Sequence, residues 1–263
     1  MRILVTGAGT GIGRATALEL ARRGHDVVAT ARRVDSLADL HVAARLELDV
    51  TDEASVATAI ASAGELDAVV NNAGISEPGP IEFYPREAFE RVLATNVMGP
   101  MLVSRAVIGP MRARGHGIIV NVSSIQGKVG VPFGGAYCAS KHALEGFSEA
   151  LHMEVGHFGI RVVIVEPGYI AQADRERVRH AYDTETYRGL HEEWDGADAK
   201  VVGDGGRPPP DVVATAIADA IEDPSSPLRV GVGSDADLVL SARATLDDVA
   251  FEAAMRKVLG LTW

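Results

Sequence analysis

Residues 1–13 read MRILVTGAGTGIG, and this stretch decides the fold. An apolar run at residues 3–5 is followed by a glycine-rich turn and then by a helical pattern. Glycines let the backbone turn tightly and approach a pyrophosphate, and the start of a helix offers unpaired N–H groups with partial positive charge. The spacing is G-x-x-x-G-x-G at Gly7, Gly11 and Gly13, not G-x-G-x-x-G. The stretch predicts a dinucleotide-binding turn between a strand and a helix, the alternative being a purely structural turn.

The rest of the chain alternates short β-branched runs with helical segments. The runs are continuously apolar, as expected for parallel strands covered on both faces. This alternation predicts a single doubly wound α/β domain of the Rossmann type over residues 1–263, with a seven-stranded parallel sheet and helices on both faces. The predicted strands are 3–5, 27–30, 45–48, 68–70, 118–122, 161–165 and 228–232. The predicted helices are 12–23, 53–63, 86–114, 136–158, 211–221 and 246–259.

Two arginines, Arg32 and Arg33, follow the second predicted strand, about twenty residues past Gly13. An acidic residue at this place would bind the ribose 2′-hydroxyl of NAD, whereas an arginine suits a 2′-phosphate. A guanidinium also forms paired hydrogen bonds with phosphate and stacks on adenine. The sequence therefore predicts NADP(H), bound mainly through Arg32. The alternative is that both arginines are surface charges paired with Asp35.

Polar side chains follow the third and fourth predicted strands. Asp49 and Val50 come after the third, and the run Asn71–Gly74 comes after the fourth. In open α/β sheets, ligands bind at the carboxyl ends of the strands. Both groups are therefore candidate cofactor contacts, although Asn and Gly are also common in ordinary turns.

A tyrosine and a lysine stand four residues apart on a predicted helix. Tyr137 lies thirteen residues past Ser124, which follows the fifth predicted strand, and Lys141 comes next at the i+4 position. That spacing puts both side chains on one helix face, close enough for the ammonium to favour a phenolate. Because a tyrosine of ordinary pKa near 10 is a poor acid or base at neutral pH, a neighbouring cation is what the chemistry requires.

In order and spacing, these motifs together with Asn96 and Pro167–Gly168 resemble the short-chain dehydrogenase/reductase family. The resemblance covers nearly the whole chain and is strongest over residues 1–170. The run YCASKHALEGF at residues 137–147 looks especially like the branch that includes 17β-hydroxysteroid and retinol dehydrogenases. In that branch an Ala-Thr-x-Arg stretch such as Ala29–Arg32 goes with NADP(H).

The resemblance implies a role for each motif residue. Tyr137 would protonate the carbonyl oxygen during reduction or remove the alcohol proton during oxidation, and Lys141 would lower its pKa and hold the nicotinamide ribose. Ser124 would hydrogen-bond the reacting oxygen, and its spacing to Tyr137 favours it over Ser123. Asn96 would anchor a water that links Lys141 to solvent. Hydride chemistry belongs to the cofactor, so no metal is expected. The expected cofactor contacts are Gly7, Thr10, Gly11, Ile12, Gly13, Arg32, Arg33, Asp49, Val50, Asn72, Ala73, Gly74, Tyr137, Lys141, Pro167, Gly168 and Ile170.

The segment Ala171–Pro210 separates the sixth predicted strand from the next helix by about forty residues, a length typical of a functional lid. The aromatic residues within it favour a lid over a solvated excursion. Substrate pockets in the family are built largely from this region, and we expect an apolar pocket with few polar anchors. The expected substrate contacts are Ser124, Gln126, Phe133, Tyr137 and Tyr169, with Ile125 and Val131 as further walls, and with Tyr182, Tyr187, His191 and Trp194 as the aromatic residues of the lid.

One residue departs from the family pattern, and several others are interpreted as structural and not as functional residues. Gln172 stands where the family often has a threonine that contacts the nicotinamide amide, and backbone groups of Ile170 would serve instead. Cys138 is interpreted as small apolar packing and not as a redox switch. The histidines of the same predicted helix, His142, His152 and His157, are interpreted as surface or satisfied polar positions and not as metal ligands.

Composition narrows the class of partner. The 263 residues carry a formal charge of −11, with no Lys/Arg-rich block, so nucleic acid and anionic membranes are not expected partners. No segment is expected to reach the roughly 20 apolar residues of a membrane span, and no signal peptide is predicted. With one cysteine and no export signal, we expect a cytoplasmic protein. The family usually pairs its long helices across subunits, which implies a homodimer or homotetramer.

Three functions compete. The first, an NADP(H)-dependent oxidoreductase interconverting a ketone or aldehyde and an alcohol on a hydrophobic small molecule, uses every motif found. The second is a non-catalytic NADP(H)-binding sensor or scaffold, since the fold does not fix function. Intact Ser124, Tyr137 and Lys141 argue against it. The third is a sugar-nucleotide epimerase or dehydratase, whose G-x-x-G-x-x-G loop and larger substrate domain are not seen.

Overall fold

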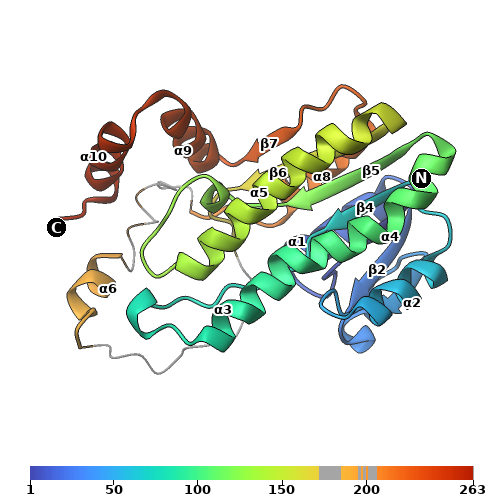
Figure 1. The fold of residues 1–263 in the computed structure, drawn as a ribbon, viewed down its shortest axis with the longest axis horizontal. Coiled ribbons are helices and arrows are strands. Elements are labelled where there is room, and N and C mark those ends of the chain that lie inside the picture. Colours follow the sequence, from blue (N-terminus) through green and yellow to red (C-terminus); the bar gives the residue numbers. More distant parts are fainter. Residues whose placement is uncertain (172–184, 195–196, 198–199, 201–205, 263) are drawn as a thin grey trace.

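The computed structural model describes residues 1–171, 185–194, 197, 200 and 206–262. Its centre is a seven-stranded sheet with the order β3-β2-β1-β4-β5-β6-β7, in which all neighbouring strands are parallel. The predicted fold class, a doubly wound parallel sheet, is confirmed (Figure 1). The strands are β1 Arg2–Val5, β2 Asp26–Ala31, β3 Ala44–Glu47, β4 Ala68–Asn71, β5 Gly117–Val122, β6 Ile160–Pro167 and β7 Arg229–Val232.

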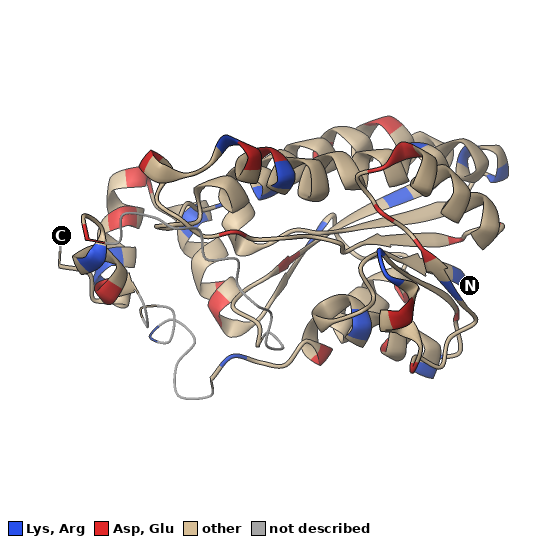
Figure 2. Cartoon of the chain, turned by 90° about the horizontal axis from the view of Figure 1, so that it is seen from below, with Lys and Arg blue, Asp and Glu red and all other residues tan. Residues whose placement is uncertain are grey.

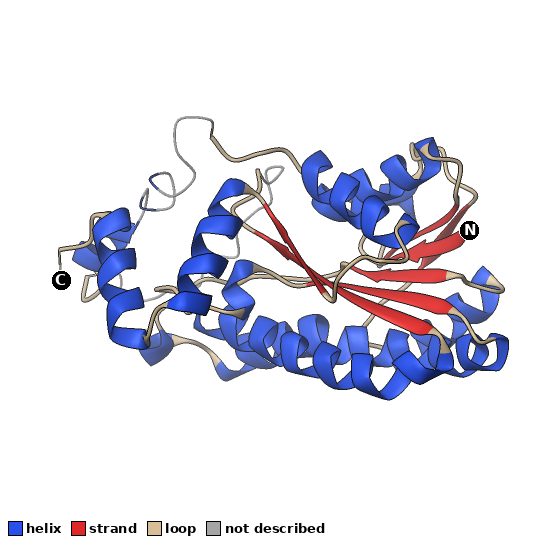
Figure 3. Cartoon of the chain, turned by 90° about the horizontal axis from the view of Figure 1, so that it is seen from above, coloured by secondary structure: helices blue, strands red, loops and turns tan. Residues whose placement is uncertain are grey.

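Helices cover both faces of this sheet (Figure 3). The α-helices are α1 Gly11–Arg22, α2 Glu53–Ala63, α3 Arg86–Leu93, α4 Gly99–Arg114, α5 Gly135–Val155, α6 Arg188–Trp194, α8 Asp211–Glu222, α9 Ser234–Thr245 and α10 Asp248–Leu259. Because strand side chains alternate, Ile3 and Val5 join one core with Leu20 of α1 and Ile217 of α8. Leu4 points the other way, into a second core formed with α2, α4 and α5.

The predicted helix 86–114 is continuous but not uniform. A π-helical turn, η3 Ala94–Met98, joins α3 to α4. The stretch Arg86–Arg114 contains an 18-residue window with mean hydropathy 1.4, so by length and composition alone it could cross a membrane. The expectation that no segment is long and apolar enough is therefore wrong. Val103, Val107 and Met111 pack on the sheet, however, as in a core helix.

Two further expectations need correction. The third and seventh strands were expected to be buried like the others, but β3 and β7 are the sheet edges and carry partly exposed side chains. An edge strand lacks a neighbour on one side and is covered less completely. The sequence pattern also missed the helices α6 and α9; α9 follows β7 directly and packs next to α10 at the carboxyl end of the sheet (Figure 1).

Candidate active site

The glycine-rich turn between β1 and α1 is built for a close backbone approach. Gly7 and Gly11 have φ of +66° and +56°, in the left-handed region that favours glycine. A Cβ on Gly13 would lie 2.2 Å from Asn72 Nδ2 and 2.4 Å from the carbonyl oxygen of Gly7. The first turn of α1 therefore packs directly on the loop after β4, and its N–H groups open towards the carboxyl end of the sheet. This cradle fits a dinucleotide phosphate.

The loop after β4 holds the glycine turn in place. Thr6 Oγ1 accepts hydrogen bonds from the backbone N–H groups of Asn72 and Ala73, both at 2.9 Å. Asn72 Nδ2 donates to the carbonyl oxygens of Thr6 at 2.8 Å and Gly7 at 3.3 Å. The Asn72 amide, expected as a cofactor contact, thus bonds the glycine turn itself, and the sequence analysis missed the part played by Thr6.

Arg32 and Arg33 follow the end of β2 beside the same turn. A Cβ on Gly9 would lie 2.7 Å from Ser36 Oγ and 3.9 Å from the Cβ of Ala31, so the turn packs against the segment that carries both arginines. Both side chains are exposed, and neither forms an ion pair with Asp35. The structure therefore does not show the pairing with Asp35, and the chain segment that carries both arginines packs against the glycine turn.

Asp49 and Val50, after β3, have local partners. Asp49 Oδ1 accepts from the N–H and the hydroxyl of Thr51, at 2.9 and 2.7 Å. Val50 is buried against Gly99, where an added Cβ would lie 2.8 Å from Val50 Cγ2. Both residues thus shape the loop next to the start of α4.

Tyr137 and Lys141 share one face of α5, as the spacing predicts. Lys141 is 5% exposed, its Nζ donates to the carbonyl oxygen of Val122 at 2.8 Å, and it lies 5.5 Å from the centroid of the Tyr137 ring. Burial lowers the pKa of Lys141 to about 8, and the charge of Glu145 opposes that shift. The ammonium is therefore fixed between the end of β5 and the Tyr137 ring.

Ser124 lies at the carboxyl end of β5, next to this pair along the chain. It is the N-cap of a short 3₁₀ helix, η4 Ile125–Gly127, and its Oγ accepts from the N–H of Gln126 at 3.2 Å. Within the described part of the chain, this hydroxyl acts only as an acceptor, so its proton is available for donation. The rival Ser123 instead turns its Oγ inward, 2.8 Å from where a Cβ on Gly127 would lie.

Asn96 lies in the π-helical turn η3, a feature frequent at functional sites. Its side-chain amide accepts from the N–H of Ile75 and donates to the Ile75 carbonyl and to Ser140 Oγ, each at 2.9 Å. Asn96 therefore ties the loop after β4 to α5. Its expected role in holding a water near Lys141 stays a prediction.

The loop after β6 is fixed by a residue that the sequence analysis missed. Asp235, 2% exposed at the start of α9, accepts a hydrogen bond from the backbone N–H of Tyr169. A Cβ on Gly168 would lie 2.2 Å from its carboxylate oxygens, which explains the glycine after Pro167. Ile170, the next expected cofactor contact, is buried.

A second missed feature is a chain of buried polar side chains between β4 and β5. Asn71 and Asn121 are paired in register, and Asn71 Nδ2 donates to Asn121 Oδ1 at 2.8 Å. Asn71 also donates to Ser104 of α4, and Asn121 donates to Ser148 of α5. Two asparagines in otherwise apolar strands are the signal that could have predicted this network.

A cavity of about 450 Å³ lies beside the candidate catalytic residues, between η4, α5 and the two last helices. Its lining includes three expected walls, Ile125, Val131 and Tyr169, and the expected lid residue Trp194. Val239 of α9 and Phe251 of α10 close its far side. Ile125 and Tyr169 are chain neighbours of Ser124 and Gly168, so the cavity borders the candidate site. Gln126 does not line it; the Gln126 side chain accepts from Cys138 Sγ.

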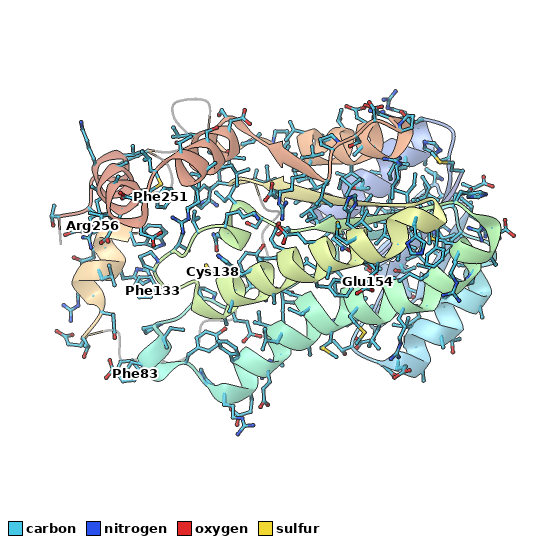
Figure 4. All side chains as sticks on the ribbon, turned by 45° about the horizontal axis from the view of Figure 1, so that its top comes forward. Phe83, Phe133, Cys138, Glu154, Phe251 and Arg256 are labelled. Atoms are coloured by element: carbon cyan, nitrogen blue, oxygen red, sulfur yellow. The ribbon has the colours of Figure 1, made fainter. Side chains whose placement is uncertain are left out.

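Phe133, also expected in the pocket, packs under α6 instead. Its ring centroid lies 6.3 Å from that of Tyr187 and 5.3 Å from that of His191, and Tyr187 also meets Phe83 at 6.0 Å. Figure 4 places Phe83, Phe133, Phe251 and Arg256 at one end of the molecule, next to the start of α5. Gln172 and Tyr182, the other lid residues singled out, lie outside the described residues.

The remaining sequence predictions concern groups away from this chemistry. Cys138 is buried, and burial raises the pKa of its thiol, which suits the packing interpretation over a reactive thiolate. Across the part of the chain that the structure describes, no group of three or more His, Cys, Asp and Glu could hold a metal ion. His142 Nδ1 donates to the carbonyl oxygen of Cys138 at 2.9 Å.

The family model for short chain dehydrogenases matches residues 1–183. The chain belongs to this family. A curated relative, the 3-ketodihydrosphingosine reductase of Bacteroides thetaiotaomicron, is 40% identical over 170 residues, covering 63% of this chain and 62% of that protein. Human retinol dehydrogenase 5 is 40% identical over 180 residues, covering 64% of this chain and 56% of that protein. The chain thus covers less than two thirds of the length of these relatives.

A short-chain dehydrogenase of Burkholderia cenocepacia, solved in complex with NADP, superposes with a TM-score of 0.78. That structure is 25% identical, and the match covers 100% of this chain and 98% of that chain. The predicted resemblance to short-chain dehydrogenases, including the retinol dehydrogenase branch, is confirmed.

Proposed function

We propose that this short-chain dehydrogenase is an NADP(H)-dependent oxidoreductase that interconverts a ketone or aldehyde and an alcohol on a hydrophobic small molecule. The observation that carries the proposal is the pair Tyr137 and Lys141 on one face of α5, with the buried ammonium 5.5 Å from the phenol ring. A buried cation next to a tyrosine supports a proton donor that works near neutral pH, as carbonyl reduction requires.

Each residue of the site has one task in this mechanism. Lys141 stays in place because the carbonyl oxygen of Val122 holds its ammonium, and its charge makes the Tyr137 hydroxyl more acidic. Tyr137 donates its proton to the carbonyl oxygen of the substrate during reduction and takes it back during oxidation. Ser124 donates a hydrogen bond from its hydroxyl to the same oxygen, keeping its proton, and stabilises the charge that develops there.

NADP(H) would be held by the glycine cradle, the start of α1 and the arginines after β2. Because Gly7 and Gly13 have no Cβ, the turn packs closely on the loop after β4. This leaves backbone N–H groups at the start of α1 for a phosphate. Arg32 and Arg33 lie on the segment that packs against the turn at Gly9, and the Burkholderia relative was solved in complex with NADP. When bound, the cofactor supplies or accepts the hydride.

The cavity beside the site supports a hydrophobic substrate. Ile125, Val129, Val131, Phe251 and Met255 contribute to its wall. Burial raises the pKa of Tyr169 to about 12, so its hydroxyl remains a hydrogen-bond donor at neutral pH among these apolar groups. The name of the Bacteroides relative, a reductase of 3-ketodihydrosphingosine, also supports reduction of a ketone on an apolar molecule.

Assembly into a homodimer or homotetramer is part of the proposal. The helices α4 and α5 lie side by side on one face of the sheet (Figure 1), and Met153 on α5 is 79% exposed. A large exposed apolar side chain on such a face supports pairing with a second copy. Light scattering after size-exclusion chromatography measures the number of copies.

The test is NADPH consumption with a panel of ketones, aldehydes and quinones, run in parallel on the native chain and on Tyr137→Phe. We expect turnover by the native chain, a loss of at least about 100-fold in kcat for Tyr137→Phe, and unchanged NADPH binding by both. Equal turnover by the two proteins would contradict the role of Tyr137. Cofactor binding without turnover in either direction would favour a non-catalytic NADP(H) sensor.

A further inference from the structure

A cluster of charged side chains, with two buried carboxyl groups, lies one helical turn behind Lys141, on the side away from Tyr137. It consists of Glu145 on α5, Glu166 on β6, Arg229 on β7 and Lys128 just after η4, and we call it the Glu145 cluster. The side chains of Glu145 and Glu166 are only 5% and 2% exposed. Burying two carboxyl groups side by side costs free energy, and nothing in the proposed mechanism has yet used them.

The contacts within the cluster are unequal. Glu145 Oε2 lies 3.1 Å from Arg229 and 3.4 Å from Lys128 Nζ. Glu166 Oε1 is 3.7 Å from Arg229 Nε, which is an ion pair without a hydrogen bond. Arg229 also binds Glu149, whose side chain is 54% exposed. Glu145 therefore has close contacts with two cations, whereas Glu166 has one longer contact with Arg229.

Three buried oxygen atoms point to a function for this arrangement. Among the residues that the structure describes, Glu145 Oε1, Glu166 Oε1 and Ser123 Oγ have no hydrogen-bond partner. Ser123 directly follows Val122, whose carbonyl binds Lys141, and Glu166 directly follows Val165, the residue paired with Val122 in the sheet. A carboxylate oxygen that accepts no hydrogen bond is not neutralised by a local donor. Its negative charge therefore acts more strongly on other charges nearby.

The charged groups near Lys141 shift its pKa and that of Glu166. On its own helix, Glu145 stands at i+4 and raises the pKa of Lys141 against the effect of burial. Glu166 faces the cluster from β6, and its pKa is raised to about 7 by burial and then by Glu145. The cations Lys128 and Arg229 lower the pKa of Glu166.

We propose that Glu145 and Glu166 are positioning residues of the oxidoreductase: together they maintain the negative charge that keeps the Lys141 ammonium protonated next to Tyr137. This inference rests on the proposed function. Because burial and then the charge of Glu145 raise the pKa of Glu166, Glu166 ionises more easily when Glu145 is neutralised. The two carboxyl groups are thus partial substitutes for each other, and removing both has a larger effect than removing either.

The titration of Lys141 tests this directly, without any substrate. The chain contains four lysines, Lys128, Lys141, Lys200 and Lys257, so lysine labelled with ¹³C at the ε position gives four NMR signals, assigned by single Lys→Arg variants. The titration midpoint of Lys141 is measured in the native chain, in Glu145→Gln, in Glu166→Gln and in the double variant. Glu149→Gln is the matched control, because it removes an exposed carboxylate that binds the same Arg229.

We expect a native midpoint of about 8. Glu145→Gln should lower it by about 0.5 unit and the double variant by about 1 unit or more, while Glu149→Gln should shift it by less than about 0.2 unit. A double variant that titrates like the native chain would overturn the inference. If the Gln variants do not fold, Lys128→Met replaces them. It removes a cation that competes for Glu145 and should raise the midpoint, and an unchanged midpoint would equally overturn the inference.

Activity gives the second arm. With NADPH and the ketone substrate found in the panel, the alkaline fall of kcat should move to lower pH in the double variant by the same interval as the Lys141 midpoint. KM and NADPH binding should stay unchanged, which a general loss of structure would not allow. If the Gln variants shift the Lys141 midpoint but the native chain turns over no substrate, the proposed function alone is contradicted. If the native chain is active but the variants leave the midpoint unshifted, this inference alone is contradicted.

Discussion

At the scale of single residues, we expect the choice of cofactor to depend on Arg32. It directly follows β2, is exposed, and borders the glycine turn through the packing of Gly9 on Ala31 and Ser36. Arg32→Ala should weaken NADPH binding by about 1.5–3 kcal/mol, the value of a hydrogen bond to a charged group, and leave NADH binding nearly unchanged. Fluorescence titration with both cofactors measures this. Arg33→Ala is the control and should cost less; an equal loss for NADPH and NADH would show that Arg32 only supports the fold.

Which residues could be predicted depended on how far apart in sequence the partners lie. Tyr137 and Lys141 are four residues apart, so helical geometry alone places them together, and the structure does so. Asp235 and Tyr169 are separated by 66 residues, and their hydrogen bond depends on how β7 and α9 return to the sheet. The same holds for Glu145 and Arg229, 84 residues apart. No local pattern contains such pairs.

At the scale of elements, Tyr187, the residue just before the short helix α6, fixes this end of the expected lid. The Tyr187 ring meets Phe83 and Phe133 edge-on, and its hydroxyl donates to Glu82 at 2.9 Å. Tyr187→Ala removes two aromatic pairs worth about 0.5–1.5 kcal/mol each, so we expect KM for the substrate to rise about tenfold while NADPH binding is unchanged. Tyr187→Phe keeps both rings and should behave like the native chain.

Steady-state kinetics and NADPH titration on these two variants separate the possible outcomes. Parallel losses of substrate and cofactor affinity in Tyr187→Ala would show that α6 supports the fold as a whole, and the lid interpretation would then be wrong. A loss in Tyr187→Phe as large as that in Tyr187→Ala would assign the effect to the bond with Glu82 instead of to ring packing.

Elements were predictable where their own residues specify them. Continuous apolar runs predicted the five inner strands, because these are covered on both faces. The same pattern overstated the burial of β3 and β7, since the pattern does not say which strand lies at an edge. The helix α9, with the sequence SDADLVLSARAT, was missed because only Asp235, Ala236 and Val239 are buried, too few to mark a helix face. The π-helical turn η3 left no sequence signal.

At the scale of the whole molecule, alternation of strands and helices predicted the fold class, and right-handed crossovers restrict how such strands are ordered. The order β3-β2-β1-β4-β5-β6-β7 itself comes from the packing of helices on two faces. The net charge of −11 is spread: Figure 2 shows acidic and basic positions interspersed along the outer helices. The sequence alone does not distinguish the buried carboxyl groups of Glu145 and Glu166 from the exposed charged residues on the outer helices.

Glu166 should make the folded chain less stable as the pH rises. A carboxylate paired with a cation usually has the opposite effect, because its pKa is lowered by folding. The pKa of Glu166 in the folded chain is about 7, above its ordinary 4.5, so the folded state holds this proton more tightly than the unfolded state. Its contribution is fully present below pH 4.5 and is lost as the pH rises to about 7, a change on the order of 3 kcal/mol. Glu166→Gln keeps a neutral side chain at every pH.

Thermal unfolding of the native chain and of Glu166→Gln, from pH 4.5 to 8, measures this contribution. We expect similar midpoints at pH 4.5 and a midpoint higher in Glu166→Gln by several degrees, about 5 °C, at pH 8. Glu149→Gln, which removes an exposed carboxylate bound to the same Arg229, should follow the native curve. Native and Glu166→Gln curves that run parallel over the whole range would mean that Glu166 is ionised throughout, with Arg229 compensating its burial at 3.7 Å.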